Sequence, residues 1–204
     1  MLLLYYLEHD QNVSRKVEKS FWVGVLKLPG SSAKGKGIIW DWFNNLPVKS
    51  VLDVGPGWGT YCRLFGKPFQ LWHAVEIHSP YVEKFHLNNW YDEVFIADIR
   101  TYTPNRHYDV IVCGDVLEHM TNDEAVEVLA KLLDYADRII VSIPLDAETN
   151  ALPGTGDVDW DNPHELHVGK WSHQLVVDTI QSLNGSIVAF ERYPEIAVYL
   201  LKQG

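Results

Sequence analysis

The stretch VLDVGPGWG at positions 51–59 joins a short apolar strand to three glycines at alternate positions. A chain that leaves a buried strand through a tight turn needs residues without side chains, because the backbone must bend sharply and approach a ligand closely. Gly55, Gly57 and Gly59 therefore predict a nucleotide-binding turn directly after this strand.

The spacing of the glycines indicates which class of ligand the turn binds. A dinucleotide site requires G-x-G-x-x-G, and counting from Gly55 its third glycine would fall at position 60, which is Thr60. The chain instead reads D-x-G-x-G-x-G, starting at Asp53. This pattern resembles the first motif of class I S-adenosylmethionine-dependent methyltransferases. The resemblance implies that Asp53, Gly55, Gly57 and Gly59 lie in the cofactor site, with the glycine loop under the amino-acid part of the methyl donor.

A second apolar run, at positions 71–76, ends in a carboxylate, Glu76. This acid follows Gly55 by 21 positions, close to the roughly 20-residue interval expected for an acid that holds a ribose. A carboxylate only accepts hydrogen bonds, so its two oxygens suit a vicinal diol. The resemblance adds Ile77 to the cofactor site. The alternative is that Glu76 caps the following helix near Ser79.

A third predicted strand, at positions 93–97, is followed by Asp98 and Ile99. The resemblance places Asp98 at the adenine amino group of the cofactor and Ile99 against the adenine ring. The alternative for Asp98 is a helix or turn cap, because aspartate often serves turns.

A fourth predicted strand starts at position 108 and runs into D-x-L-E-H at positions 115–119. In the methyltransferase family such a stretch lies at the mouth of the cofactor and substrate site, which implies a cofactor contact for Asp115. The following strand, 138–144, also ends as the fifth strand of the family often does. The resemblance covers roughly residues 51–144, and four motifs in the expected order are more specific than any one of them.

Alternation of strands and helices predicts a mostly parallel sheet that is covered on both faces. The last two strands, 187–191 and 196–201, are expected to pair as a hairpin. The predicted fold is α/β, a Rossmann-like, doubly wound, mostly parallel seven-stranded sheet with a C-terminal antiparallel hairpin strand. The helix candidates are residues 59–65, 80–89, 123–135 and 173–183.

Two parts of the chain are expected, an N-terminal helical cap or arm at residues 1–50 and a class I methyltransferase domain at residues 51–204. The arm carries aromatic residues at positions 21–22 and 40–43. They are expected either to cap the cofactor end of the sheet or to cover the core as ordinary packing.

The arm also contains G-x-x-x-x-G-K at positions 30–36, which resembles a phosphate-binding loop. The next residue is Gly37, where such a loop needs Ser or Thr to bind magnesium. We therefore expect a solvated loop that includes Lys36 and has no part in nucleotide binding.

The connection after the fifth strand, residues 145–172, is long and rich in Trp and His, which indicates a functional loop. Residues 162–171 look similar to the substrate wall of small-molecule methyltransferases. His119, His164 and His167 are the candidates for a catalytic base, and each has a structural role as its alternative. His164 and His167 are three positions apart and could instead bind a metal, but no carboxylate or cysteine set completes such a site in the sequence, so no metal is expected.

The predicted function is methyl transfer from S-adenosylmethionine to a small-molecule acceptor through oxygen, nitrogen or sulfur. The alternatives are a non-catalytic protein that binds S-adenosylmethionine and an aminopropyl-type transferase of the same fold. The sequence gives no indication of an oligomeric state.

The chain has 204 residues and a net charge of −10, which suits one soluble domain. Residues 1–50 hold 7 Lys and Arg against 4 Asp and Glu, and the remainder holds 10 against 23. A nucleic acid is an unlikely partner for such an acidic body. Two cysteines, Cys62 and Cys113, indicate buried thiols in a reducing compartment. Residues 1–7 are too short to span a bilayer, so we expect a cytoplasmic protein without membrane contact.

Overall fold

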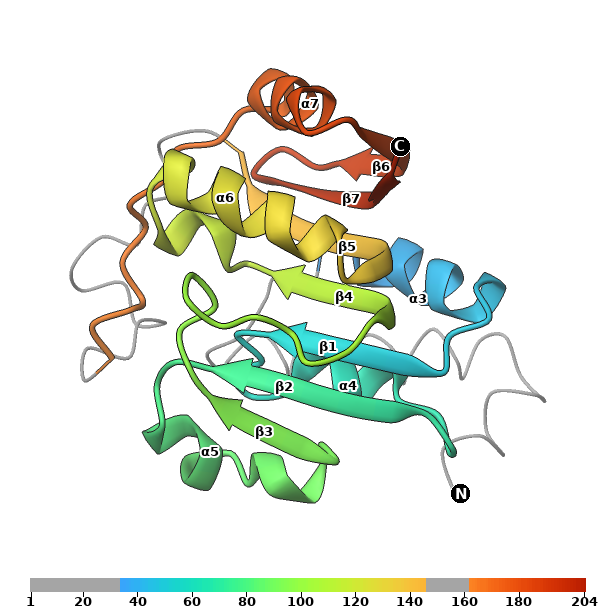
Figure 1. Cartoon of the computed structure of the whole chain (residues 1–204), viewed down its shortest axis with the longest axis vertical. Helices are drawn as coiled ribbons and strands as arrows, with labels where there is room; N and C mark the ends of the chain where they lie inside the picture. The colour runs from blue at the N-terminus through green and yellow to red at the C-terminus, as the bar shows by residue number, and fades with distance from the viewer. Residues whose placement is uncertain (1–33, 146–161) are drawn as a thin grey trace.

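Seven strands form one sheet in a computed structural model of the chain, which describes residues 34–145 and 162–204 (Figure 1). The strand order is β3-β2-β1-β4-β5-β7-β6. The strands are β1 (Ser50–Val54), β2 (Leu71–Glu76), β3 (Glu93–Ile96), β4 (Tyr108–Gly114), β5 (Ala136–Pro144), β6 (Gly185–Arg192) and β7 (Ile196–Gln203). Strands β1 to β5 pair in parallel, and β7 is antiparallel to both β5 and β6. This confirms the predicted Rossmann-like fold and its C-terminal hairpin.

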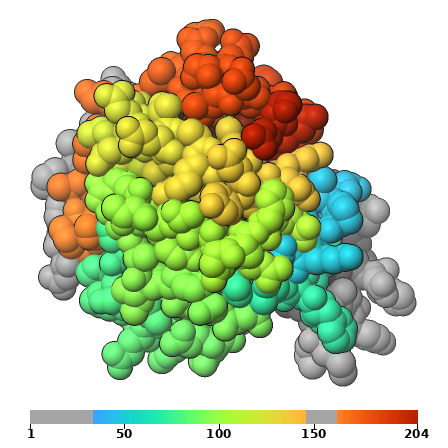
Figure 2. All heavy atoms as spheres, viewed as in Figure 1, coloured from blue at the N-terminus to red at the C-terminus, as the bar shows by residue number. Residues whose placement is uncertain are grey.

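Helices cover both faces of the sheet. They are α3 (Lys36–Asn45), α4 (Thr60–Phe65), α5 (Pro80–Lys84), α6 (Asn122–Leu133) and α7 (His173–Ser182), with short 3₁₀ turns η1 (Leu87–Asn89) and η2 (Leu117–His119). Apolar side chains of α6 and α7 join one hydrophobic cluster, and those of α3, α4 and α5 join a second one. Figure 1 shows α6 in front of the sheet and α4 behind it, and Figure 2 shows α6 over the middle of the front face.

The central strands are mostly apolar because both of their faces are covered. All five residues of β1 are buried, whereas β3, at one edge of the sheet, has no buried residue. The core therefore lies on both sides of β1, β4 and β5.

The expected single helix at residues 80–89 is wrong. The chain forms α5, leaves helical geometry at His86, where φ is 53°, and continues as η1. A left-handed residue ends the helical hydrogen-bond pattern, and neither composition nor periodicity marked His86 as such a residue.

Of the aromatic residues of α3, Phe43 packs into the core, whereas Trp40 is exposed. Phe43 stacks on Phe65 and Trp72, with ring centroids 5.3 and 5.8 Å apart. Trp72 is the second residue of β2, so this contact lies toward the amino ends of the strands. Of the two alternatives, core covering is therefore correct for Phe43. The aromatic pair at positions 21–22 lies outside the described residues.

Cys62 and Cys113 are buried free thiols, as expected. In residues 34–145 and 162–204 no helix is long and apolar enough to cross a membrane.

A capping box starts α6. Thr121 Oγ1 accepts from the backbone N–H of Glu124, and Glu124 Oε2 accepts from the backbone N–H of Thr121. We predict that Thr121→Ala lowers the free energy of unfolding by about 0.5–2 kcal/mol, because donors at the helix start lose their acceptor. Urea denaturation measures this change. Thr103→Ala, at an exposed loop position, is the control, and an equal loss in both variants would contradict the capping role.

Candidate active site

The crevice at the carboxyl ends of β1 and β4 is the natural ligand position in this fold. The two strands are neighbours, with Val54 opposite Cys113, while their connections lead to opposite halves of the sheet. Ligands of open α/β sheets bind outside the carboxyl ends of the strands at such a point. The glycine loop follows β1, and Asp115 follows β4.

The glycine loop depends on backbone conformations that other residues rarely adopt. Gly55, Gly57 and Gly59 have φ values of 60°, 52° and 82°. A Cβ at Gly55 would also lie 2.9 Å from a methyl carbon of Val116. These residues therefore build a sharp turn that residues other than glycine would rarely adopt.

Glu76, the last residue of β2, is buried and bound to the glycine loop. Its Oε1 accepts from the N–H of His78 at 2.8 Å, and its Oε2 accepts from the N–H of Gly57 at 3.4 Å. Burial raises the pKa of the carboxyl to about 7, although both N–H groups lower it. The capping alternative does not hold, since His78 precedes α5 and is not part of its first turn. A carboxylate oxygen can accept more than one hydrogen bond, so each oxygen of Glu76 can also accept from a ribose hydroxyl.

Lys36 is fully buried at the start of α3, so the expectation of a solvated loop is wrong at this residue. Its Nζ donates to the hydroxyl of Tyr61 at 2.8 Å and lies 4.3 Å from the centre of that ring. Burial lowers the pKa of the ammonium to about 8, and the charges of Asp115 and Asp53 oppose this shift. Lys36 is thus a cation held among the acids of the crevice.

The sequence contained a signal for this burial. Lys36, Ile39 and Phe43 are the buried residues of α3, and their spacing of three and four puts them on one helical face. The phosphate-loop pattern at positions 30–36 predicts a solvated Lys36, whereas this periodicity predicts a buried one.

Asp53 lies inside β1 and is almost completely buried. Its Oδ2 accepts from the hydroxyl of Tyr91 at 2.6 Å, and its Oδ1 has no partner among the described residues. Burial raises the pKa of the carboxyl to about 7, and the charge of Glu76 adds to this effect, while Tyr91 and Lys36 oppose it. The partner Tyr91 was not predicted.

Two more acids follow β4. Asp115 adopts φ 58° and accepts from the hydroxyl of Ser142 at 2.8 Å. Glu118, in η2, is 2% exposed, and neither of its carboxylate oxygens has a hydrogen-bond partner on another described residue. Burial, with the charge of Asp115 next, raises the pKa of Glu118 well above its usual range.

Asp98 lies after β3 and is paired with Arg100. The carboxylate accepts from Nε and Nη2 of Arg100 at 2.7–3.0 Å, and Arg100 also binds Glu124. The hydrogen bonds from Arg100 lower the pKa of Asp98. Ile99 is buried in the core, and Ile77 is half-buried beside Glu76.

The segment from Asn162 to Trp171 docks on η2. The N–H groups of Val168 and Gly169 both donate to the backbone oxygen of Glu118, at 2.7 and 2.9 Å. A Cβ at Gly169 would lie 2.5 Å from the backbone oxygen of Met120, so only glycine allows this approach. Asn122 fixes the same segment through two hydrogen bonds to the backbone of Lys170.

This docking brings two of the three predicted histidines together. The ring centroids of His119 and His167 are 4.9 Å apart. His164 is exposed, and it contributes to the electrostatic field at Asp98. His119 and His167 therefore lie beside the crevice acids, whereas His164 does not join them.

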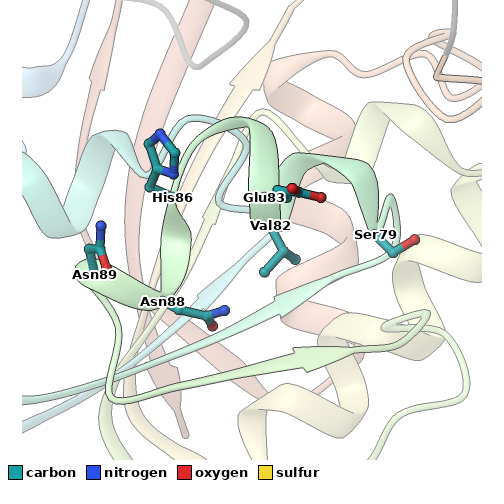
Figure 3. Close-up of a pocket in the computed structure, with 6 residues that line it drawn as sticks. All are labelled: Ser79, Val82, Glu83, His86, Asn88 and Asn89. Atoms are coloured by element: carbon teal, nitrogen blue, oxygen red, sulfur yellow. The ribbon is translucent and has the colours of Figure 1, made fainter.

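A surface pocket lies outside this crevice, on α5 and η1. Figure 3 shows the six residues that line it: Ser79, Val82, Glu83, His86, Asn88 and Asn89. They include neither the glycine loop nor the acids at the strand ends, so this pocket has no part in the candidate site.

A family model described as a methyltransferase domain matches residues 34–147. The chain belongs to this family of methyltransferases, and the predicted class of enzyme and its cofactor, S-adenosylmethionine, are confirmed. A comparison with curated proteins found no significant match.

Solved structures share the fold at low sequence identity. One is magnesium protoporphyrin IX methyltransferase from Synechocystis PCC 6803 with bound S-adenosylmethionine, at 17% identity and TM-score 0.60, covering 82% of this chain and 77% of that one. Another is 1,6-didemethyltoxoflavin N1-methyltransferase from Burkholderia thailandensis, at 15% identity and TM-score 0.65. This match covers 95% of this chain and 86% of that one. A third is an O-methyltransferase of a Brevibacillus brevis polyketide synthase, at 14% identity and TM-score 0.54. This match covers 78% of this chain and 67% of that one.

The raised pKa of Asp53 predicts an unusual pH dependence of stability. An unfolded aspartate titrates near 3.8, whereas folded Asp53 titrates at about 7. Between these values the native state holds a proton that the unfolded state has lost, so stability falls as the pH rises through this window. Asp53→Asn removes that titration while its amide oxygen still accepts from Tyr91. We expect the melting temperature of the variant to fall less between pH 4 and 7 than that of the wild type.

Asp41→Asn, at an exposed position of α3, is the matched control and should follow the wild type. Equal pH dependence of Asp53→Asn and the wild type would mean that Asp53 is ionised throughout this range in the folded protein.

Proposed function

We propose that the chain transfers a methyl group from S-adenosylmethionine to the oxygen, nitrogen or sulfur of a small-molecule acceptor. The observation that carries this proposal is the set of buried acids around the glycine loop. Asp53, Glu76 and Glu118 all have raised pKa values at one edge of the sheet, and Lys36 offsets only part of this charge. A ligand with a net positive charge, a ribose and an amino-acid group suits such an edge.

The residues of the crevice fit the parts of that ligand. Glu76 would accept from the two ribose hydroxyls, and the backbone of the loop at Gly55, Gly57 and Gly59 would lie against the amino-acid part. The buried ammonium of Lys36 would bind the carboxylate of that part. Asp53 and Asp115 would favour its positive charges, with Ser142 and Tyr91 holding the two acids in place.

The adenine end is assigned to residues after β2 and β3. Ile77 and Ile99 would flank the ring, and Asp98 would accept from the adenine amino group while Arg100 holds its carboxylate. The ion pair keeps Asp98 ionised, which suits an acceptor role.

S-adenosylmethionine supplies an activated methyl group when bound, so the main task of the chain is to align donor and acceptor. Alignment alone can contribute about 7–11 kcal/mol. For an acceptor that must lose a proton, a base adds roughly 10²- to 10⁴-fold. His119 and His167 each have a ring nitrogen within 4.8 Å of a carboxylate oxygen of the buried Glu118, so they are the better candidates for that base.

The acceptor class is supported by the neighbours in fold. One carries 1,6-didemethyltoxoflavin, and one is named for magnesium protoporphyrin IX, both of them small molecules. The acidic body makes nucleic acid an unlikely partner. A cytoplasmic location, an arm at residues 1–50 and a catalytic domain at residues 51–204 are further parts of the proposal.

Glu76→Gln should weaken binding of S-adenosylmethionine about tenfold to a hundredfold, because one acceptor oxygen becomes a donor and the charge is lost. Isothermal calorimetry on wild type and variant measures this, with micromolar affinity, about −8 kcal/mol, expected for the wild type. Glu83→Gln, an exposed change on α5, should bind like the wild type. No heat with a folded wild-type sample would refute the cofactor site.

Lys36→Met should weaken binding of S-adenosylhomocysteine about tenfold or more, because the amino-acid carboxylate loses a charge-assisted hydrogen bond. Methylthioadenosine keeps the adenosine part and lacks the amino-acid part, so the variant should bind it like the wild type. Lys67→Met, an exposed change, is the control for both ligands. Equal weakening of both ligands would assign Lys36 to folding rather than to the carboxylate.

Transfer itself is measured with a tritiated methyl donor, the purified protein and a cell extract freed of macromolecules. Label in a small molecule is the expected result, and label that appears only in added RNA or protein would contradict the acceptor class.

A further inference from the structure

Glu118, His119 and His167 bring three metal-binding groups to one point. One ligand atom from each lies within 4.8 Å of the other two. Glu118 and His119 belong to η2, and His167 comes from the segment that docks on it, 48 residues later. The sequence alone predicts no metal, because no carboxylate completes a site with His164 and His167, and the fold supplies that carboxylate through η2.

The carboxylate of Glu118 is the strongest sign of a missing partner. It is 2% exposed, and both oxygens lack a hydrogen-bond partner on another described residue. A buried acid without partners is costly. The nearby negative charges of Asp115 and Glu165 increase the cost of ionising Glu118. A cation bound to Glu118 would offset this cost directly.

His119 is oriented as metal-binding histidines usually are. Its Nδ1 lies 3.3 Å from the backbone oxygen of Leu166, which can only accept a hydrogen bond. The proton therefore belongs on Nδ1, and Nε2 keeps the lone pair that binds a metal. The same carbonyl belongs to the docked segment, so one contact orients His119 and positions the neighbour of His167.

We propose that Glu118, His119 and His167 form a binding site for a divalent transition-metal ion such as Zn²⁺ or Mn²⁺. Two imidazoles and one carboxylate favour such an ion over Mg²⁺ or Ca²⁺, which prefer oxygen ligands. Ligand atoms around one ion are about 3–4 Å apart, because each is about 2 Å from the metal. Binding would therefore require the three ligand atoms, which lie within 4.8 Å of one another, to move closer together.

Three protein ligands leave coordination positions open. In the proposed enzyme these positions lie at the acceptor mouth and suit an oxygen of the acceptor, an assignment that rests on the proposed function. Metal binding itself does not depend on it.

The test uses the untagged full chain, stripped with a chelator and titrated with Zn²⁺ or Mn²⁺ in the absence of methyl donor. We expect one ion per chain by calorimetry and elemental analysis, weaker binding of Mg²⁺, and a visible absorption band with Co²⁺. His119→Ala and His167→Ala should each weaken binding roughly a hundredfold or more. His164→Ala, three residues from His167, is the matched control and should bind the metal like the wild type.

Glu118→Gln separates a metal ligand from a structural residue. The change removes a buried charge at nearly constant volume, so the metal-free variant should melt at or above the temperature of the wild type. Its gain in melting temperature on adding Zn²⁺ should be lost.

Three results would overturn the site. They are the absence of stoichiometric binding in a folded sample, metal affinity that survives His119→Ala and His167→Ala, and loss of affinity in His164→Ala. Calorimetry with S-adenosylmethionine on the same stripped protein keeps the two proposals apart, because a failed metal site leaves the donor site intact.

Discussion

The parallel pairing of β1 with β4 is the constraint on which the site depends. It sets Val54 beside Cys113, so the glycine loop and Asp115 leave the sheet next to each other. Gly114 allows Tyr61 to lie against the end of β4, since a Cβ there would be 2.1 Å from the tyrosine ring. Tyr61 in turn accepts from Lys36. The positions of Lys36, the glycine loop and Asp115 therefore follow from this one register.

Electrostatics then sets what the crevice can hold. Asp53, Glu76 and Glu118 are buried, and burial is the largest cause of the raised pKa of each. A protein keeps such groups at a cost in stability, and the cost is recovered when a positively charged ligand binds. The proposed methyl donor carries that charge at Asp53 and Glu76. The proposed metal ion carries it at Glu118, which has no hydrogen-bond partner on another described residue.

The segment that carries His167 is attached through both backbone groups and side chains, among them the side chain of Asn122. Two N–H groups meet the backbone oxygen of Glu118, and Gly169 lies against the backbone of Met120. Such contacts depend on a glycine at one position and tolerate change elsewhere in the segment. They hold the ring of His167 beside that of His119.

The sequence by itself determined the positions of the strands along the chain, the glycine loop and the acids at the strand ends, because local patterns of apolar residues and glycines encode them. Glu76 and Asp115 could be named from their position after a strand. The prediction of a solvated Lys36 was wrong, because it followed the phosphate-loop pattern at positions 30–36, whereas the helical periodicity of α3 predicts burial. The break at His86 and the partners Tyr61 and Tyr91 gave no local signal. Only the tertiary structure decided that His167, rather than His164, meets His119 and Glu118, because that contact joins residues 48 positions apart through a docked segment.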